Sequence, residues 1–153
     1  MSAMEITIPL QRGVYLLSDI VHKYDSAQRK HVCFRRFYVG ESHDCAQRLL
    51  SHRMEGRLIN PRMVLLAETM SRSIHGKINR RRLEQRFMAA AIRMGIPLTI
   101  NGKDTLPTEH DSWELEAETG VLRDALGILS TPSDYDQKHL PAKHRCPAIQ
   151  GAA

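Results

Sequence analysis

The chain of 153 residues is long enough to bury a hydrophobic core without metal or disulfide staples. Its composition, with 42% hydrophobic and 25% charged residues, is that of an ordinary globular protein and argues against wholesale disorder. No apolar run approaches the ~20 residues of a membrane span, and the N-terminus lacks the basic and apolar regions of an export signal. We therefore expect one compact domain plus a tail, a cytoplasmic location and no membrane partner.

The net charge of +5 is divided unevenly along the chain. Residues 1–103 contain 18 basic and 8 acidic residues, whereas residues 104–153 contain 4 and 9. A basic segment attracts polyanions, and neutralisation of phosphates by Lys and Arg dominates nucleic-acid binding. Nucleic acid is therefore the leading partner, and a merely solvated basic face is the alternative.

The three cysteines, Cys33, Cys45 and Cys146, do not form a C-x-x-C pair. They indicate neither a disulfide framework nor a cysteine zinc site, so we expect reduced thiols. His139 and His144 lie close to Cys146, but they stand among prolines and without a fourth ligand. This pattern argues against a metal site in that segment.

Two strands are expected near the N-terminus, over residues 13–19 and 32–40. The segment that joins them, residues 22–31, is polar and longer than a tight hairpin turn, so we expect a solvent loop. Alternation along the second strand puts Phe37 on the core face and Tyr38 on the opposite face. Tyr38 is therefore available for a site.

A glycine turn and a helix follow the second strand. Gly40 ends the strand at a position where a residue without a Cβ lets the chain turn or a ligand approach. Asp44 and Gln47 resemble a capping box, so a helix is expected to begin at Asp44. Arg48 and His52 stand at i and i+4 on this helix, which places both on one face near the end of the preceding strand.

A buried strand and a long helix are expected next. Residues 63–67 form a continuous apolar run typical of a central strand that is covered on both faces. Residues 68–76 are polar and predict a loop. The helix expected over residues 78–94 has an apolar stripe bordered by Glu84, so this carboxylate lies beside the core without being enclosed in it.

The last predicted elements are a short extended piece and an acidic helix. Residues 98–102 are the extended piece. Asp111 and Glu114 resemble a second capping box, and the apolar stripe over residues 121–129 predicts an amphipathic helix. We expect this helix to cap the core, with support of a homodimer as the alternative.

These elements divide the chain into three parts. They are a basic domain over residues 1–103, an acidic helical extension packed on it over residues 104–130, and a mobile tail over residues 131–153. No zinc finger or helix-turn-helix is recognisable after the basic domain. Sequence specificity would therefore be low or supplied by a partner protein.

Two tripeptides and four later residues resemble the signature of the GIY-YIG nuclease family. Residues 13–15 read Gly-Val-Tyr and residues 38–40 read Tyr-Val-Gly, where valine replaces isoleucine and keeps a β-branched strand residue. The resemblance covers about residues 13–101. It departs from the family at Glu41, where relatives often have a basic or small polar residue. The six matching positions, in the order and spacing of the family, are Tyr15, Tyr38, Arg48, His52, Glu84 and Asn101.

The resemblance implies an α+β fold with a small three-stranded mixed sheet flanked by helices, and a metal-dependent endonuclease that hydrolyses phosphodiester bonds in DNA. Glu84 would bind one Mg²⁺ or Mn²⁺, hard ions suited to carboxylate and water ligands. Arg48 would meet the developing negative charge with a planar fork of donors. Tyr15, aided by His52 and Tyr38, would orient or deprotonate the attacking water. The asparagine that completes the motif would hold the backbone of the site in place.

Basic side chains outside the motif are expected to contact the DNA backbone, with a solvated basic face as the alternative. These side chains are Arg35, Arg36, Arg80 and Arg81. Glu68, at the end of the third predicted strand, is a rival metal carboxylate. It is disfavoured because it lacks the helix context of the motif glutamate.

Each motif residue also has a purely structural interpretation when it is taken alone. The tyrosines would be half-buried strand aromatics, Arg48 and His52 a solvated helix face, and Glu84 the partner of Arg80 within a helix. For the whole protein, the alternatives to a nuclease are a nucleic-acid-binding module that has lost cleavage and a structural or protein-interaction domain. The intact set of six positions favours the enzyme.

Overall fold

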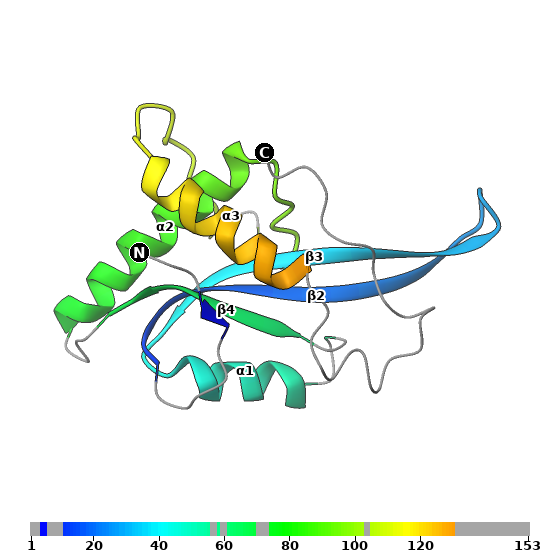
Figure 1. Ribbon diagram of the computed structural model, residues 1–153, viewed down its shortest axis with the longest axis horizontal. Helices are drawn as coiled ribbons and strands as arrows, with labels where there is room; N and C mark the ends of the chain where they lie inside the picture. The colour runs from blue at the N-terminus through cyan, green and yellow to red at the C-terminus, as the bar shows by residue number, and fades with distance from the viewer. Residues whose placement is uncertain are drawn as a thin grey trace.

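A computed structural model describes residues 4–5, 11–55, 58, 61–69, 74–102 and 105–130. The architecture is α+β, as the sequence predicts, with helices on both faces of one sheet (Figure 1). The strands are β1 (Met4–Glu5), β2 (Gly13–Asp25), β3 (Lys30–Ser42) and β4 (Arg62–Glu68). The helices are α1 (Cys45–Met54), α2 (Ile74–Arg93) and α3 (Glu116–Ser130).

The strands lie in the order β1-β4-β2-β3, and every pairing in the described sheet is antiparallel. The expectation of a mixed sheet is therefore wrong for the strands that the structure describes. The reason lies in the connection through α1, which carries the chain from β3 to the far side of β2. Strands β3 and β4 consequently run in the same direction, but β2 lies between them and is antiparallel to both.

Strands β2 and β3 form a hairpin that is longer than the sequence predicts. The register pairs them continuously out to Asp25 and Lys30, so the prediction of a solvent loop over residues 22–31 is wrong. The chain turns only over residues 26–29, where the Asp25 carboxylate accepts hydrogen bonds from two backbone N–H groups. The polar composition was misleading because this part of the hairpin is exposed and needs no core-facing side. In Figure 1 the hairpin projects beyond the rest of the sheet.

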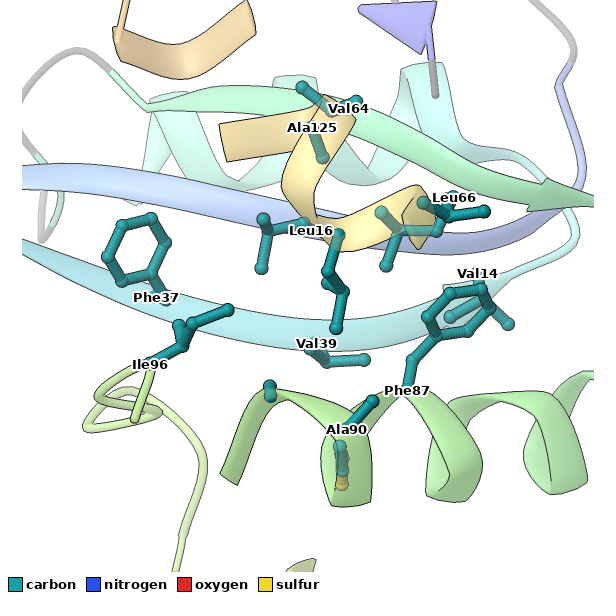
Figure 2. Close-up of a cluster of buried hydrophobic side chains, with 14 of the residues drawn as sticks. Val14, Leu16, Phe37, Val39, Val64, Leu66, Phe87, Ala90, Ile96 and Ala125 are labelled. Carbon is teal, nitrogen blue, oxygen red and sulfur yellow. The ribbon is translucent and has the colours of Figure 1, made fainter. Parts of the chain in front are cut away.

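Two buried clusters cover the two faces of the sheet. On one face, Leu16 packs in a cluster with Phe87 of α2 and Ala125 of α3 (Figure 2). On the other face, Leu17 packs in a cluster with Leu49 of α1. Helix α1 therefore covers one face of the β2–β3 hairpin, while α2 and α3 cover the opposite face (Figure 1).

Helix α1 begins where the sequence predicts. Asp44 is its N-cap, and the Asp44 carboxylate accepts a hydrogen bond of 3.0 Å from the backbone N–H of Gln47. The first turn is tied to the start of β2, because the backbone N–H of Cys45 donates to the carbonyl of Gln11 at 2.8 Å. Burial raises the pKa of the Cys45 thiol to about 12, so this cysteine stays protonated and acts as a packing residue. These contacts fix the helix that carries Arg48.

Two other helix starts differ from the prediction. Helix α2 begins at Ile74, inside the segment 68–76 that was expected to be a loop. Helix α3 begins at Glu116 rather than at Asp111, because residues 111–112 form a turn. Aspartate is favoured in turns as well as at helix starts, so a short capping pattern is ambiguous between the two.

Helix α3 belongs to the same core as α2. Its buried side chains include Leu122. Glu118, in the first turn of α3, forms an ion pair of 2.6 Å with Arg86 of α2. The buried guanidinium of Arg62 on β4 donates to the backbone carbonyls of Leu129 and Ile128, at 3.3 and 3.4 Å. A positive charge therefore meets the negative end of the helix dipole.

Some of the predicted organisation lies outside the described residues. The expected tail over residues 131–153 lies outside them, together with His139, His144 and Cys146. Among the helices of the described ranges, none has the length and apolar character needed to cross a membrane.

Replacing Leu122 with alanine tests whether α3 is integral to the fold. Leu122 is fully buried, so Leu122→Ala should lower the free energy of unfolding in urea by about 2–5 kcal/mol. Arg123→Ala, at the exposed neighbouring position, should change it by no more than about 0.5 kcal/mol. Equal, small losses in both variants would show that α3 is dispensable for the domain.

Candidate functional site

The centre of the site is the contact between Tyr15 and Gly40, which lie opposite each other on β2 and β3. A Cβ built on Gly40 would lie 2.6 Å from the Tyr15 hydroxyl oxygen and 2.4 Å from Cε1 of Tyr38. Real Cβ atoms do not approach other atoms so closely. Glycine is therefore required here because two tyrosine rings occupy the space that any side chain would fill.

The first tripeptide also contains a glycine that is required by packing. A Cβ on Gly13 would lie 1.8 Å from the carbonyl oxygen of Ala67 on β4, a backbone atom that cannot move away. Gly13 therefore allows β2 and β4 to approach closely at the start of the sheet. The Sγ of Cys45 lies 3.9 Å from the Gly13 carbonyl oxygen, which joins α1 to the same point.

Four of the six motif residues meet on the face of the hairpin covered by α1. The ring centroids of Tyr15 and Tyr38 are 6.0 Å apart, and those of Tyr38 and His52 are 6.1 Å apart in an edge-on arrangement. The Arg48 guanidinium is within hydrogen-bonding reach of the Tyr15 and Tyr38 hydroxyl groups. Strand alternation and the i, i+4 spacing in α1 together produce this cluster, as the sequence predicts.

Neither tyrosine of this cluster is ionised at neutral pH. Burial raises the pKa of Tyr15 far above its ordinary value, and the neighbouring Tyr38 raises it further. Burial also raises the pKa of Tyr38, with a second contribution from the charge of Glu84. The Arg48 charge opposes both shifts without cancelling them. Both hydroxyl groups therefore act as hydrogen-bond partners rather than as anions.

His52 is the neutral base of the cluster. Burial lowers its pKa, and the positive charge of Arg48 lowers it further. Its Nε2 atom is buried, and no group among the described residues forms a hydrogen bond with it. A neutral imidazole can accept a proton, whereas the tyrosines beside it retain theirs.

Glu84 lies on the other side of β3, close to Glu41. Burial raises the pKa of the Glu84 carboxyl to about 7, and the charge of Glu41 raises it as well. Arg81 and a hydrogen bond from the backbone N–H of Glu41 act in the opposite direction. A groove of about 690 Å³ opens beside these residues and is lined by both glutamates, Arg81 and Trp113. The motif glutamate therefore lies close to the end of β3 and faces an accessible space.

Glu41 is a residue of the site that the sequence did not assign. Its carboxylate accepts a hydrogen bond of 2.9 Å from Nε of Arg80, and Arg80 is only 3% exposed. This placement does not support the expectation that Arg80 contacts DNA from the surface, nor the expectation that it pairs with Glu84. The signal in the sequence was the acidic residue directly after the second tripeptide, which departs from the family pattern.

Asn101 holds the backbone of the site. Its side-chain amide accepts a hydrogen bond from the backbone N–H of Val39 and donates one to the Val39 carbonyl, both at 3.0 Å. The next contact along the strand is a backbone hydrogen bond of 3.3 Å from Ile100 to Phe37. Asn101 is buried. Its role differs from that of the tyrosine hydroxyl groups, because it fixes the backbone of β3 between Tyr38 and Gly40.

The other basic residues expected to contact DNA differ in their surroundings. Arg36 forms an ion pair of 2.6 Å with Asp19, whose side chain is fully buried, and Arg35 lies 3.4 Å from the Ser18 hydroxyl. Arg36 retains 31% of its side-chain exposure in this pair. Arg81 is exposed on α2 and lines the groove beside Glu84. Arg81 is therefore the best placed of these arginines for a phosphate near the site.

Glu41 at the end of β3 and Glu84 of α2 are the residues that could hold a divalent cation. Ionised Glu41 and Glu84 repel each other, and a bound cation would relieve this repulsion. Mg²⁺ keeps several of its waters and needs only one or two protein carboxylates together with a substrate phosphate. Within the described ranges, no three His, Cys, Asp or Glu side chains cluster, so a site enclosed by protein ligands is not formed there. Glu68, the rival carboxylate, is exposed at the end of β4.

Comparisons of this chain with protein-family models, with curated proteins and with solved structures found no match. The likeness of the two tripeptides to a nuclease signature stays a prediction. The candidate site rests on its residues and their geometry.

Replacing Gly40 with alanine tests the packing at the centre of the site. The new methyl group would overlap the Tyr15 ring, so Gly40→Ala should lower the free energy of unfolding by about 1–3 kcal/mol. Adding Tyr15→Leu makes room, so the double variant should lose less than the sum of the single losses, by about 0.5–3 kcal/mol. Additive losses in denaturant titrations would contradict the contact.

The titration of Glu84 tests the pairing of the two glutamates. Carboxyl NMR should give Glu84 a pKa of about 7, and Glu41→Gln should lower it, because the substitution removes a negative charge and releases Arg80. A folded-state pKa above the unfolded value means that this group costs stability as pH rises from about 4.5 to about 7. Glu84→Gln should remove that slope. An unchanged Glu84 pKa in Glu41→Gln would contradict the electrostatic coupling.

Proposed function

We propose that this protein is a divalent-metal-dependent endonuclease of the GIY-YIG type that hydrolyses phosphodiester bonds in DNA. The observation that carries the proposal is the convergence of the motif residues on the last residues of β3. Tyr15, Tyr38, Arg48 and His52 meet on one side of this strand, and Glu84 reaches the backbone of the same strand from the other side. The α+β architecture and the basic charge of residues 1–103 support the same function.

Arg48 has the role of binding the phosphate. Its side chain is exposed, and the neighbouring tyrosine hydroxyl groups raise its pKa, so its charge is permanent. The Tyr15 and Tyr38 hydroxyl groups are within hydrogen-bonding reach of the guanidinium and restrict its orientation. A planar fork of donors held in this way matches the oxygens of a phosphate as negative charge develops. Tyr15 is completely buried and therefore positions Arg48 rather than touching the water.

Tyr38 and His52 have the role of handling the attacking water. Tyr38 is half-buried, so its hydroxyl group is close enough to the surface to orient a water. The oxygen of this water forms a bond to phosphorus as the bond from phosphorus to the 3′ oxygen breaks. The water proton passes to the neutral imidazole of His52, and the 3′ oxygen takes a proton from solvent.

Glu84, with Glu41 beside it, would hold Mg²⁺ or Mn²⁺. The ion would supply positive charge against the phosphate and the leaving oxygen. Arg81 lines the same groove and adds a fixed charge for the anionic substrate.

A second candidate function is a nucleic-acid-binding module with the same fold and no cleavage. One observation favours it: the Arg80 guanidinium already neutralises Glu41, which weakens the attraction of the pair for a cation. This candidate predicts salt-dependent DNA binding by a protein that does not cut.

Nicking of supercoiled plasmid in Mg²⁺ tests the proposed function. The wild type should nick DNA in Mg²⁺ and not in EDTA. Arg48→Ala should lower the rate by about 10²–10³-fold through loss of charge stabilisation. Glu84→Ala should lower it by at least about 10²-fold, because the ion accounts for several kcal/mol of transition-state stabilisation.

Matched controls lie on α3, away from the site. Arg123→Ala and Glu116→Ala remove the same charges from exposed positions and should cut at the wild-type rate. Cleavage that persists in both site variants would refute the assignment of Arg48 and Glu84. Binding without cleavage by the wild type would establish the second candidate instead.

A further inference from the structure

The outer half of the β2–β3 hairpin extends beyond the third strand of the sheet. Strand β4 pairs with β2 only over residues 13–18, whereas β3 pairs with β2 out to Asp25. Among the described residues, positions 19–36 therefore form a two-stranded arm, and its outer part, beyond the buried Asp19 and Ile20, projects from the body of the molecule in Figure 1. The ion pair between the buried Asp19 and the half-buried Arg36 lies at its base.

The arm carries large apolar side chains that no core covers. Tyr24 is 54% exposed and Phe34 is 45% exposed. An isolated hairpin gains nothing from exposing such groups to water. Tyr24 lies opposite His31 and Phe34 opposite Val21, so the two side chains are on opposite faces of the arm. The aromatic side chains are interleaved with exposed basic residues, Lys23, Arg29 and Lys30.

One face of the arm is continuous with the face of β3 that carries the site. Alternate residues of a strand project to the same face, so Lys30, Phe34 and Arg36 share the face of Tyr38. Cross-strand register adds Lys23, which lies opposite Val32 on that face. A row of basic and apolar side chains therefore leads from the candidate catalytic residues to the tip of the arm.

We propose that the arm binds the DNA duplex that flanks the scissile phosphate, as a two-stranded ribbon in the major groove; this inference rests on the proposed nuclease function. The major groove of B-form DNA, about 12 Å wide, admits a two-stranded β-ribbon. The lysines at the edge of the ribbon contact phosphates, and Phe34 contacts the base edges, where thymine presents a methyl group. The deep, narrow major groove of an RNA duplex excludes such a ribbon, so the arm selects DNA.

The length of the arm sets the position of this contact. Eight residues separate Tyr38 from Lys30, which corresponds to about 26 Å at ~3.3 Å per residue. At ~3.4 Å per base pair, the tip of the arm reaches about eight base pairs from the phosphate that is cut. Duplexes that end closer to the site than this distance cannot use the arm.

Fluorescence anisotropy in EDTA tests this proposal without requiring cleavage. The probes are labelled DNA duplexes of ~24 and ~10 base pairs and an RNA duplex of ~24 base pairs. Phe34→Ala should weaken binding of the longer DNA about tenfold and leave the RNA unchanged. Lys30→Ala should lower the slope of log affinity against log salt by about one for the longer DNA. Lys30→Ala should lower this slope less for the short DNA, because the tip of the arm is reached only when the site binds near one end of the ~10 base pairs.

The matched controls are Ile92→Ala and Arg123→Ala, which remove an exposed apolar and an exposed basic side chain from the helices. Both should bind all three probes as the wild type does. Equal effects of Phe34→Ala on DNA and RNA, or no effect on either, would overturn the proposal. A concentration-dependent dimer in sedimentation that Phe34→Ala dissociates would also overturn it, because the arm would then bind a second copy. Plasmid nicking by the wild type is measured separately, so failure of the arm and failure of the nuclease function give different results.

Discussion

The packing of Tyr15 over Gly40 is the constraint on which the candidate site depends. Because position 40 has no side chain, the Tyr15 ring can lie across β3 and bring its hydroxyl group to Arg48. The same free space accommodates the edge of the Tyr38 ring. The peptide that follows Gly40 then presents its N–H group to Glu84. One missing Cβ thus leaves room for the tyrosines and Arg48 on one side of the strand, while Glu84 approaches the strand from the other side.

The site is arranged around the end of an edge strand rather than in an enclosed cavity. Residues three positions apart in a strand project to opposite faces, so Tyr38 faces α1 while Glu41 faces α2. Their cross-strand partners, Leu17 and Val14, lie on the same two faces. The groups proposed to handle water and the groups proposed to hold a cation therefore lie on opposite faces of one strand. A polymer passing along the open edge can contact both sets, whereas a small molecule would need a closed pocket.

The parts of the site that depend on neighbours within one turn or one strand were predictable from the sequence. The Asp44 cap and the shared face of Arg48 and His52 are of this kind, because capping and helical spacing act over three or four residues. The ion pair between Arg80 and Glu41 was not predictable, because it joins positions 39 residues apart and depends on how α2 crosses the sheet. The long hairpin was missed for a related reason: cross-strand pairing stabilises it, and its exposed composition is that of a loop. The antiparallel sheet followed from the position of β2 between β3 and β4, which no local pattern specifies.

The two hydrogen bonds of Asn101 have a consequence for the behaviour of the protein in solution. Strand β3 is at the edge of the sheet, and an edge offers unpaired N–H and carbonyl groups to any extended chain that approaches it. The Asn101 amide has the same donor and acceptor as a peptide group, so it occupies the Val39 position that an added strand would use. This single side chain therefore blocks the pairing of a further strand at this point of the edge, next to the residues that would carry out the chemistry.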